Sequence, residues 1–216
     1  MPVSPDRLVE LLVGLIAASG AIGAAPRLRV AVDGPPAAAP ASLADALVEP
    51  LRSRGRPVVR VSAESFLRPA SLRLEHGRTD ADSYRSGWLD VSALQREVLG
   101  PFASSGRFLP SLWDAARDRA TREAARESPP GAVLIVDGTF LLDRRLVFDV
   151  TVHLHLNPDA LARRTPADLR WTLPAFDGYD GAGADVVVAL SDPAHPAVTV
   201  RAGDRSAGSR PYRRAD

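Results

Sequence analysis

Residues 131–142, GAVLIVDGTFLL, constrain most strongly what this chain can fold into. The segment starts as a run of apolar or small side chains with no alternation between apolar and polar positions. Such a strand is buried on both faces, which is typical of parallel sheets covered by helices. Four other short apolar segments are predicted strands: residues 28–34, 57–66, 148–156 and 184–190. The sequence therefore predicts an α/β domain of three layers, with a central, mostly parallel, five-stranded sheet between helices.

Helical segments separate these strands. They are predicted over residues 4–16, 42–55, 91–102 and 157–165. Ser4 and Asn157 are the expected N-caps of the first and last helix, because each is followed by proline and then by apolar residues at helical spacing. Pro50 is expected to kink or shorten the second helix, and Gly100-Pro101 to stop the third.

The domain organisation follows from these segments. Residues 1–25 form an N-terminal helix and linker, residues 26–202 the main domain with a small helical lid at about 158–180, and residues 203–216 a disordered polar tail. The apolar N-terminal run contains Glu10 and is shorter than a membrane span. A signal peptide is the alternative interpretation, but a docked helix is favoured, which predicts a cytoplasmic protein.

Composition excludes several classes of function. The 216 residues carry a formal net charge of +1, so bulk electrostatics does not predict a nucleic-acid or membrane partner. The chain has no cysteine, which excludes disulfides, thiolate metal sites and a cysteine nucleophile. It also has no lysine, so all 27 basic residues are arginine. A small-molecule partner is expected, and a homo-oligomer stays open.

The loop after the first strand has the position of a phosphate-binding loop without its side chains. Such a loop reads G-x-x-x-x-G-K-[ST] between a strand and a helix. Counting on from Asp33-Gly34, the second glycine, the lysine and the hydroxyl positions hold Ala39, Pro40 and Ala41. Three prolines in the loop also remove backbone N–H donors that would face an anion. Ser42 is the remaining hydroxyl, and an N-cap role is favoured for it over magnesium binding.

Polar residues follow three of the predicted strands at their carboxyl ends. They are Asp33-Gly34, Glu64 and Asp137-Gly138. Ligands of open parallel sheets bind beyond these ends, so the convergence predicts a binding site there. Each group also has a simpler interpretation, as a solvated strand end or as an Asx-turn.

Other residues leave two interpretations open. His153 and His155 share one face of the fourth strand, a spacing that suits a metal ion, but no third ligand is evident nearby. Packed, hydrogen-bonded histidines are therefore favoured. Trp88, Trp113 and Trp171 fit either a core or the wall of a pocket.

Longer segments resemble the uridine kinase and related nucleoside kinase family, in particular its actinobacterial-type members, which have a P-loop NTPase fold. The similarity covers residues 28 to about 200. It rests on VAVDG and the following helix, RPVVRVSAESFLRP (56–69), GAVLIVDGTFLL (131–142), ALARRTPADLRWTLPAFDGY (160–179) and ADVVVALSDPAHPAV (184–198). The SF-x-R segment and the closing strand with DP-x-HP are fairly specific together, whereas VDG alone is not.

The resemblance implies roles for matching residues. Glu64 stands where the family has the carboxylate that takes the proton from the ribose 5′-hydroxyl. Asp137 would hold Mg²⁺, and the lid arginines that neutralise the transferring phosphoryl group would be Arg163, Arg164 and Arg170. The region expected to shape the nucleoside pocket contains Arg68, Tyr84, Asp90, Trp113, Asp114 and Arg122.

Two main functional hypotheses result. The resemblance implies ATP-dependent 5′-phosphorylation of a pyrimidine nucleoside, with Mg²⁺ and ATP as cofactors. The altered loop favours an inactive pseudo-kinase that binds a nucleoside or another small ligand, without such cofactors. A third hypothesis is an interaction protein whose cleft is a relic.

Overall fold

The computed structural model describes residues 2–19, 27–192 and 194–201. Its centre is a six-stranded sheet in the order β10-β9-β8-β1-β7-β2. The strands are β1 (Leu28–Asp33), β2 (Val58–Ser62), β7 (Val133–Gly138), β8 (Val150–His155), β9 (Val186–Ala189) and β10 (Ala197–Val200). The five predicted strands are present and run parallel, so the prediction of a central, mostly parallel sheet is confirmed.

The sixth strand, β10, was not predicted as a strand. It pairs antiparallel with β9 and has half-buried and exposed residues, so it lacks the apolar run that marks the inner strands. The N-terminus completes this edge: the Val3 N–H donates to the Pro196 carbonyl at 2.9 Å, and Pro2 forms a bridge with Ala197.

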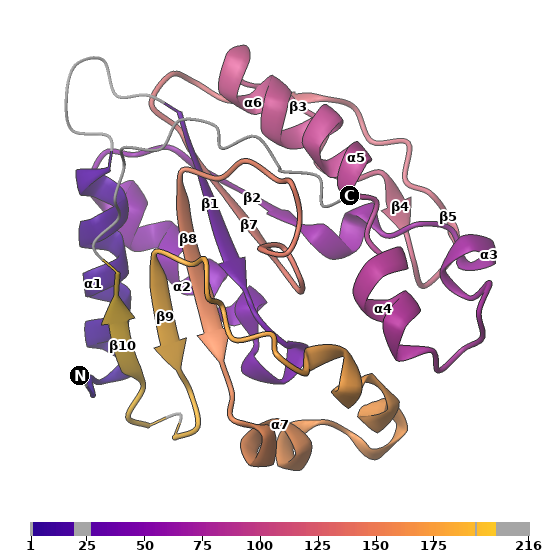
Figure 1. Ribbon diagram of the computed structural model, residues 1–216. Coiled ribbons are helices and arrows are strands. Elements are labelled where there is room, and N and C mark those ends of the chain that lie inside the picture. Colours follow the sequence, from indigo (N-terminus) through magenta and orange to yellow (C-terminus); the bar gives the residue numbers. More distant parts are fainter. Residues whose placement is uncertain (1, 20–26, 193, 202–216) are drawn as a thin grey trace, which may run out of the picture.

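Helices cover both faces of the sheet (Figure 1). On one face, α1 (Pro5–Ala18) and α2 (Pro40–Ser53) bury leucines against β1 and β8. On the other lies a continuous helical segment made of α5 (Val91–Ala93), the π-helix η3 (Leu94–Leu99) and α6 (Gly100–Ser104). Burying a leucine contributes about 1.5–3 kcal/mol, so these two apolar layers hold the sheet in place.

Shorter elements complete the chain. The 3₁₀ turns η1 (Pro36–Ala38) and η2 (Ala63–Phe66) follow β1 and β2. The helices α3 (Ala70–Arg73), α4 (Ala81–Gly87), α7 (Pro158–Arg164) and the 3₁₀ helix η4 (Ala167–Phe176) lie at the carboxyl edge of the sheet (Figure 1). Two small hairpin-like sheets are formed by β3 (Arg107–Phe108) with β6 (Arg126–Glu127) and by β4 (Trp113–Asp114) with β5 (Arg119–Ala120).

The N-cap predictions are confirmed for Ser4 and Asn157 and wrong for Ser42. Ser4 Oγ accepts from the Arg7 N–H, and Asn157 Oδ1 accepts from the Ala160 N–H at 2.8 Å. The helix α2 begins at Pro40, so Ser42 lies inside its first turn. Proline suits a first helical position because its φ is already helical. The helix therefore starts at Pro40, two residues closer to the N-terminus than the predicted start at residue 42.

Two predictions about helix ends are also wrong. Pro50 does not end α2, which continues to Ser53. Gly100-Pro101 does not stop the third predicted helix, because the π-helical turn before it changes the hydrogen-bond partners. The Gly100 N–H reaches back five residues to Gln95, and the Glu97 carbonyl that Pro101 leaves unpaired accepts from Leu109 N–H instead.

Two further points concern the chain ends. The predicted linker over residues 20–25 and the predicted tail over residues 203–216 lie outside the described residues. Within the part of the chain that the structure describes, no helix is long and apolar enough to cross a membrane.

Candidate functional site

The carboxyl ends of β1, β7 and β8 lie side by side. Asp33 is paired in register with Gly138 of β7 on one side and His153 of β8 on the other. Gly34 follows in a tight passage: a Cβ there would lie 2.8 Å from the Leu154 carbonyl oxygen. Glycine is therefore required where the chain leaves β1, as the loop pattern predicted.

Most of the loop's backbone N–H groups donate to protein carbonyls. Gly34 N–H donates to the Gly138 carbonyl, and the amides of Ala38 and Ala39 close the η1 turn on carbonyls of the loop. The Ser42 amide donates to Ala39, which has a left-handed φ of 53°. Three of the nine residues from 34 to 42 are prolines and four others donate to carbonyls, so this loop is not a cradle of N–H groups converging on an anion.

Asp33 has a structural role at the base of the loop. Its side chain is fully buried, and Oδ1 accepts from the Leu141 N–H at 2.8 Å. Oδ2 lies 2.6 Å from His153 Nδ1 and accepts from the Tyr179 hydroxyl at 2.8 Å. Burial, followed by the charge of Asp33, raises the pKa of Tyr179, so Tyr179 remains a donor. His153 is thus packed and hydrogen-bonded, as predicted.

Asp137, the predicted magnesium ligand, is held by an arginine. Its side chain is 4% exposed, and Oδ1 accepts from Arg60 Nε at 2.8 Å. Arg60 Nη1 also pairs with Asp45 of α2. Burial lowers the pKa of Arg60, but the hydrogen bonds and charges of Asp137 and Asp45 outweigh this effect and raise it. The guanidinium therefore supplies the positive charge beside Asp137.

These observations test whether the residues fit Mg²⁺ and ATP. The carboxylate that would approach the metal is bonded to Arg60, and Ala41 stands at the position of the metal-binding hydroxyl. The described residues also contain no group of three or more His, Cys, Asp or Glu side chains that suits a metal ion. The residues present do not fit a magnesium–nucleotide group.

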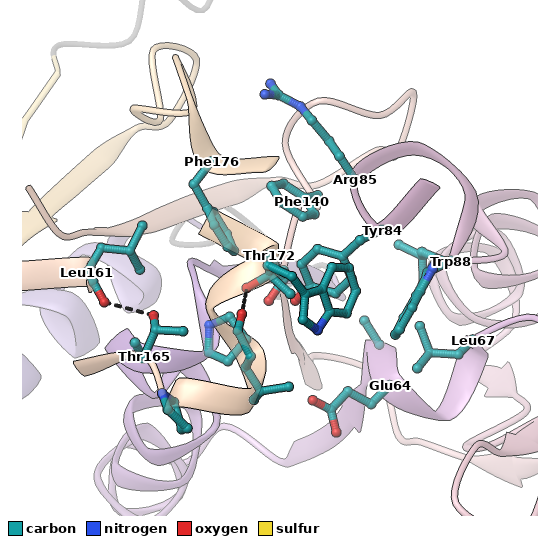
Figure 2. A pocket seen from close by; sticks show the side chains of 18 of the residues that line it. Glu64, Leu67, Tyr84, Arg85, Trp88, Phe140, Leu161, Thr165, Thr172 and Phe176 are labelled. Atoms are coloured by element: carbon teal, nitrogen blue, oxygen red, sulfur yellow. Dashed lines mark hydrogen bonds between the residues drawn. The ribbon is translucent and has the colours of Figure 1, made fainter. Parts of the chain in front are cut away.

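A cavity of about 310 Å³ lies beside this loop, between η2, α4 and the segment from α7 to η4. Five aromatic side chains line it: Tyr84, Trp88, Phe140, Trp171 and Phe176. We call it the aromatic cavity (Figure 2). Tyr84 is central, with ring centroids 5.0 Å from Trp88 and 5.6 Å from Trp171. The rings meet mostly edge to face, a favourable arrangement that fixes the shape of the wall.

Glu64 brings a carboxylate to the aromatic cavity. It lies on η2, directly after β2, and its side chain reaches the cavity from below in Figure 2. No other described residue donates a hydrogen bond to this carboxylate. Burial, followed by the charge of Glu64, raises the pKa of Tyr84 to about 12. The cavity thus has an aromatic wall and one negatively charged hydrogen-bond acceptor, the Glu64 carboxylate, that is available to a ligand.

Two arginines that sequence reasoning did not assign, Arg85 and Arg144, also line the cavity. Arg85 donates to the carbonyls of Ala175 and Asp177 and pairs with Asp143 at 2.7 Å. Arg144 donates to backbone carbonyls of α4, and burial lowers its pKa. Both guanidinium groups therefore fasten α4 to the neighbouring loops.

The three predicted lid arginines lie outside the lining of the aromatic cavity. Arg163 and Arg170 are exposed on α7 and η4. Arg164 donates to the Ser191 carbonyl at 3.1 Å. Their role as a phosphate clamp stays a prediction.

Of the residues predicted for a nucleoside pocket, the structure brings Tyr84 to the aromatic cavity beside Glu64. Asp90 caps α5 by accepting from the Ala93 N–H. The others lie in surface grooves or in the β4–β5 hairpin: Arg68, Trp113, Asp114 and Arg122. Trp113 donates from Nε1 to Asp118, and Asp114 pairs with Arg117.

Sequence reasoning missed two aromatic lining residues and left two tryptophans undecided. Phe140 and Phe176 carried no signal of their own, and Arg144 follows a strand end without a motif. The sequence left open whether Trp88 and Trp171 belong to the core or to a pocket wall. In the structure both line the cavity. The density of aromatic residues in WTLPAF, within the predicted lid, was the available signal for this wall.

Comparison with solved structures shows which fold this chain has. A possible uridine kinase from Bacillus stearothermophilus superposes with a TM-score of 0.64 at 20% identity, over 84% of this chain and 97% of that chain. D-glycerate 3-kinase from Cryptococcus neoformans gives 0.51 at 14% identity, over 82% and 80%. The chain has the fold of the P-loop kinases. No protein-family model matches the chain, and no curated protein matches it either. The predicted resemblance is confirmed at the level of the fold.

Proposed function

We propose that this chain is a nucleoside-binding protein with a P-loop kinase fold that does not transfer a phosphoryl group. The observation that carries the proposal is the contrast between two neighbouring parts of the site. The loop has no lysine and most of its N–H groups donate to protein carbonyls, whereas the aromatic cavity beside it has an open volume and an available carboxylate.

The phosphate side of the site lacks what the chemistry needs. Phosphoryl transfer depends almost entirely on positioning and on electrostatic stabilisation of the transferring group. Removing a single well-placed donor typically costs about 10²–10³ in rate. Here Pro40 replaces the lysine, Ala41 replaces the metal-binding hydroxyl, and Asp137 is paired with Arg60. Together these losses support a rate of phosphoryl transfer far below that of an ordinary kinase.

The ligand side suits a nucleoside. A volume of about 310 Å³ is within the range of small-molecule sites. Tyr84, Trp171 and Phe176 offer faces and edges for a planar base, and stacking contributes about 1–3 kcal/mol per base. The Glu64 carboxylate is placed to accept hydrogen bonds from ribose hydroxyls. The ligand we propose is a pyrimidine nucleoside.

An active nucleoside kinase is the second candidate, and one observation favours it. Glu64 lies at the end of β2, lines the cavity and has no hydrogen bond to its carboxylate from another described residue. A general base for a sugar hydroxyl needs this arrangement. The binding proposal and the kinase candidate therefore share Glu64 and differ in whether phosphate is transferred.

Calorimetric titration of the purified chain with uridine and with magnesium–ATP tests the proposal. We expect uridine to bind and magnesium–ATP to give no heat of binding. Trp171→Ala should weaken uridine binding about 5- to 100-fold, which corresponds to the loss of one stacking partner. Trp113→Ala is the matched control, because Trp113 lies in the β4–β5 hairpin, and it should bind as the wild type does.

A kinase assay separates the two candidates. Formation of UMP from uridine and ATP at an ordinary kinase rate, abolished in Glu64→Gln, would establish the kinase and overturn the binding proposal. Absence of uridine binding in the folded wild-type chain would overturn both.

A further inference from the structure

The 3₁₀ helix η4 forms one wall of the aromatic cavity and depends on its neighbours for support. Trp171 and Phe176 line the cavity from it. The helix has ten residues and contains Pro174. Hydrogen bonds in 3₁₀ helices have poorer geometry than those in α-helices, and runs longer than three or four residues are uncommon. The position of η4 is therefore set by its contacts with other elements.

Both ends of η4 are extended joints. Thr165 and Pro166, directly before it, have ψ angles of 122° and 150°. Asp177, directly after it, has a ψ of 123° and is followed by Gly178 with a left-handed φ of 70°. A few residues at the ends of an element are enough to absorb the dihedral changes of a hinge. These joints allow η4 to turn as a unit relative to the helix before it.

The contact of η4 with α4 is an apolar cluster of its own. Its buried side chains are Phe140, Ala175 and Tyr179, and Tyr84 and Phe176 pack against them. Phe176 stacks on Phe140 with ring centroids 4.8 Å apart. The cluster is distinct from the two that cover the faces of the sheet, although the partly buried Phe176 also packs against one of them. Regions with few buried apolar contacts open more readily than the core, so η4 can open while the sheet stays folded.

Arg85 of α4 is the charged residue that bridges this interface. Its Nη1 donates to the carbonyls of Ala175 and Asp177 at 3.1 and 2.9 Å, at the carboxyl-terminal end of η4. Its Nη2 pairs with Asp143 at 2.7 Å. The base of the bridge is held as well, because Arg144 donates to the backbone carbonyl of Arg85. Hydrogen bonds from a charged donor are stronger than neutral ones, so Arg85 ties the end of η4 firmly to α4.

The guanidinium of Arg85 is placed to hold η4 and not a ligand. Its carbon Cζ lies 5.8 Å from the ring centroid of Phe140 and 5.6 Å from that of Tyr179, on the side of the apolar cluster. In Figure 2 the Arg85 side chain extends away from Glu64, the carboxylate that is available to a ligand. Removal of Arg85 should therefore change how often the cavity opens and not how a ligand is held inside it.

We propose that Arg85 is a positioning residue that latches η4 over the aromatic cavity and so sets the rates at which a ligand enters and leaves. When its bonds to the Ala175 and Asp177 carbonyls break, η4 turns at its two joints and carries Trp171 and Phe176 away from α4. The inference rests on the proposed function for the identity of the ligand, whereas the latch itself can be tested without one.

Amide hydrogen exchange of the full chain tests the latch. Arg85→Met removes both carbonyl bonds and should speed exchange in residues 167–179 about 10- to 100-fold, with β1 and β7 unchanged. Arg85→Lys keeps the charge but not the planar fork, so it should recover part of the protection. Arg117→Met is the matched control, because Arg117 also pairs with an aspartate, at 3.0 Å, but lies in the β4–β5 hairpin. It should leave exchange in residues 167–179 unchanged.

Stopped-flow binding of uridine, followed by tryptophan fluorescence, tests the control of access. We expect Arg85→Met to raise the association and dissociation rates about tenfold each and to leave Kd within about twofold, because η4 must open for both steps. A general loss of structure would instead speed dissociation alone and weaken binding.

Equal acceleration of exchange in β1 and β7, or no acceleration in residues 167–179, would overturn the latch. Faster release of uridine from Arg85→Met with unchanged association would overturn the control of access, because Arg85 would then act on the bound ligand. Absence of uridine binding in the folded wild-type chain would overturn the proposed function, and the exchange experiment would still decide the latch.

Discussion

Replacing Arg60 by methionine tests whether this arginine neutralises Asp137. The Asp137 side chain is 4% exposed and Arg60 is 27% exposed. Removing one partner of a fully buried ion pair destabilises a protein by about 3–5 kcal/mol, because the other charge stays buried without a partner. Since Arg60 is partly solvated, we expect a loss of about 2–3 kcal/mol. For a chain of this size, that lowers the melting temperature by about 5–10 °C.

The measurement is urea denaturation followed by tryptophan fluorescence. Asp45→Asn is the internal comparison, because Asp45 pairs with the same guanidinium but is 65% exposed. It should cost less than about 1 kcal/mol. The double variant Arg60→Met/Asp137→Asn should be more stable than the sum of the single effects, since it leaves no buried unpaired charge. Equal losses in Arg60→Met and Asp45→Asn, or additive effects in the double variant, would refute the reasoning.

Three further predictions concern stability. Tyr179→Phe removes a hydrogen bond to the buried carboxylate of Asp33 and should cost about 1.5–3 kcal/mol in thermal or urea unfolding. The pKa of Tyr84 is raised to about 12 in the folded chain, so above pH 10 the unfolded chain loses the phenol proton first and the free energy of unfolding should fall. Tyr84→Phe should abolish about 1 kcal/mol of this loss between pH 9.5 and 11. Ser4→Ala should cost about 1 kcal/mol, whereas Ser42→Ala should change unfolding by less than about 0.5 kcal/mol, because Ser4 is an N-cap and Ser42 is an exposed residue within a helix. A flat alkaline profile, or equal effects of the two serine variants, would contradict these assignments.

Much of the sheet could be predicted because each inner strand carries its own signal. The strand β7 is buried throughout and opens with four apolar residues, 133–136, and that pattern depends only on neighbouring residues. The edge strand β10 has no such pattern, since solvent covers part of it. The prediction that Gly100-Pro101 ends a helix failed because it used a local rule only. The Glu97 carbonyl that Pro101 leaves unpaired accepts a hydrogen bond from the distant Leu109 N–H.

The candidate site could be predicted only in part, because its contacts join distant residues. The loop chemistry was visible in the sequence, and Glu64 could be assigned to a strand end. The pairing of Arg60 with Asp137 spans 77 positions, and no local pattern indicates it. The aromatic wall likewise joins Tyr84 to Trp171, and spacing along the chain does not reveal which aromatic residues meet.

The contact between Val3 and Pro196 has a consequence for how the protein opens. Among the described residues, the outermost strand β10 has β9 on one side and the short segment of residues 2–3 on the other. The same segment leads directly into α1, which packs on the core through Leu12 and Ile16. Local opening of β10 therefore releases residues 2–3 as well, and these residues and β10 form one cooperative unit. In amide hydrogen exchange, the Val3 amide and the paired amides of β10 should exchange with the same opening free energy.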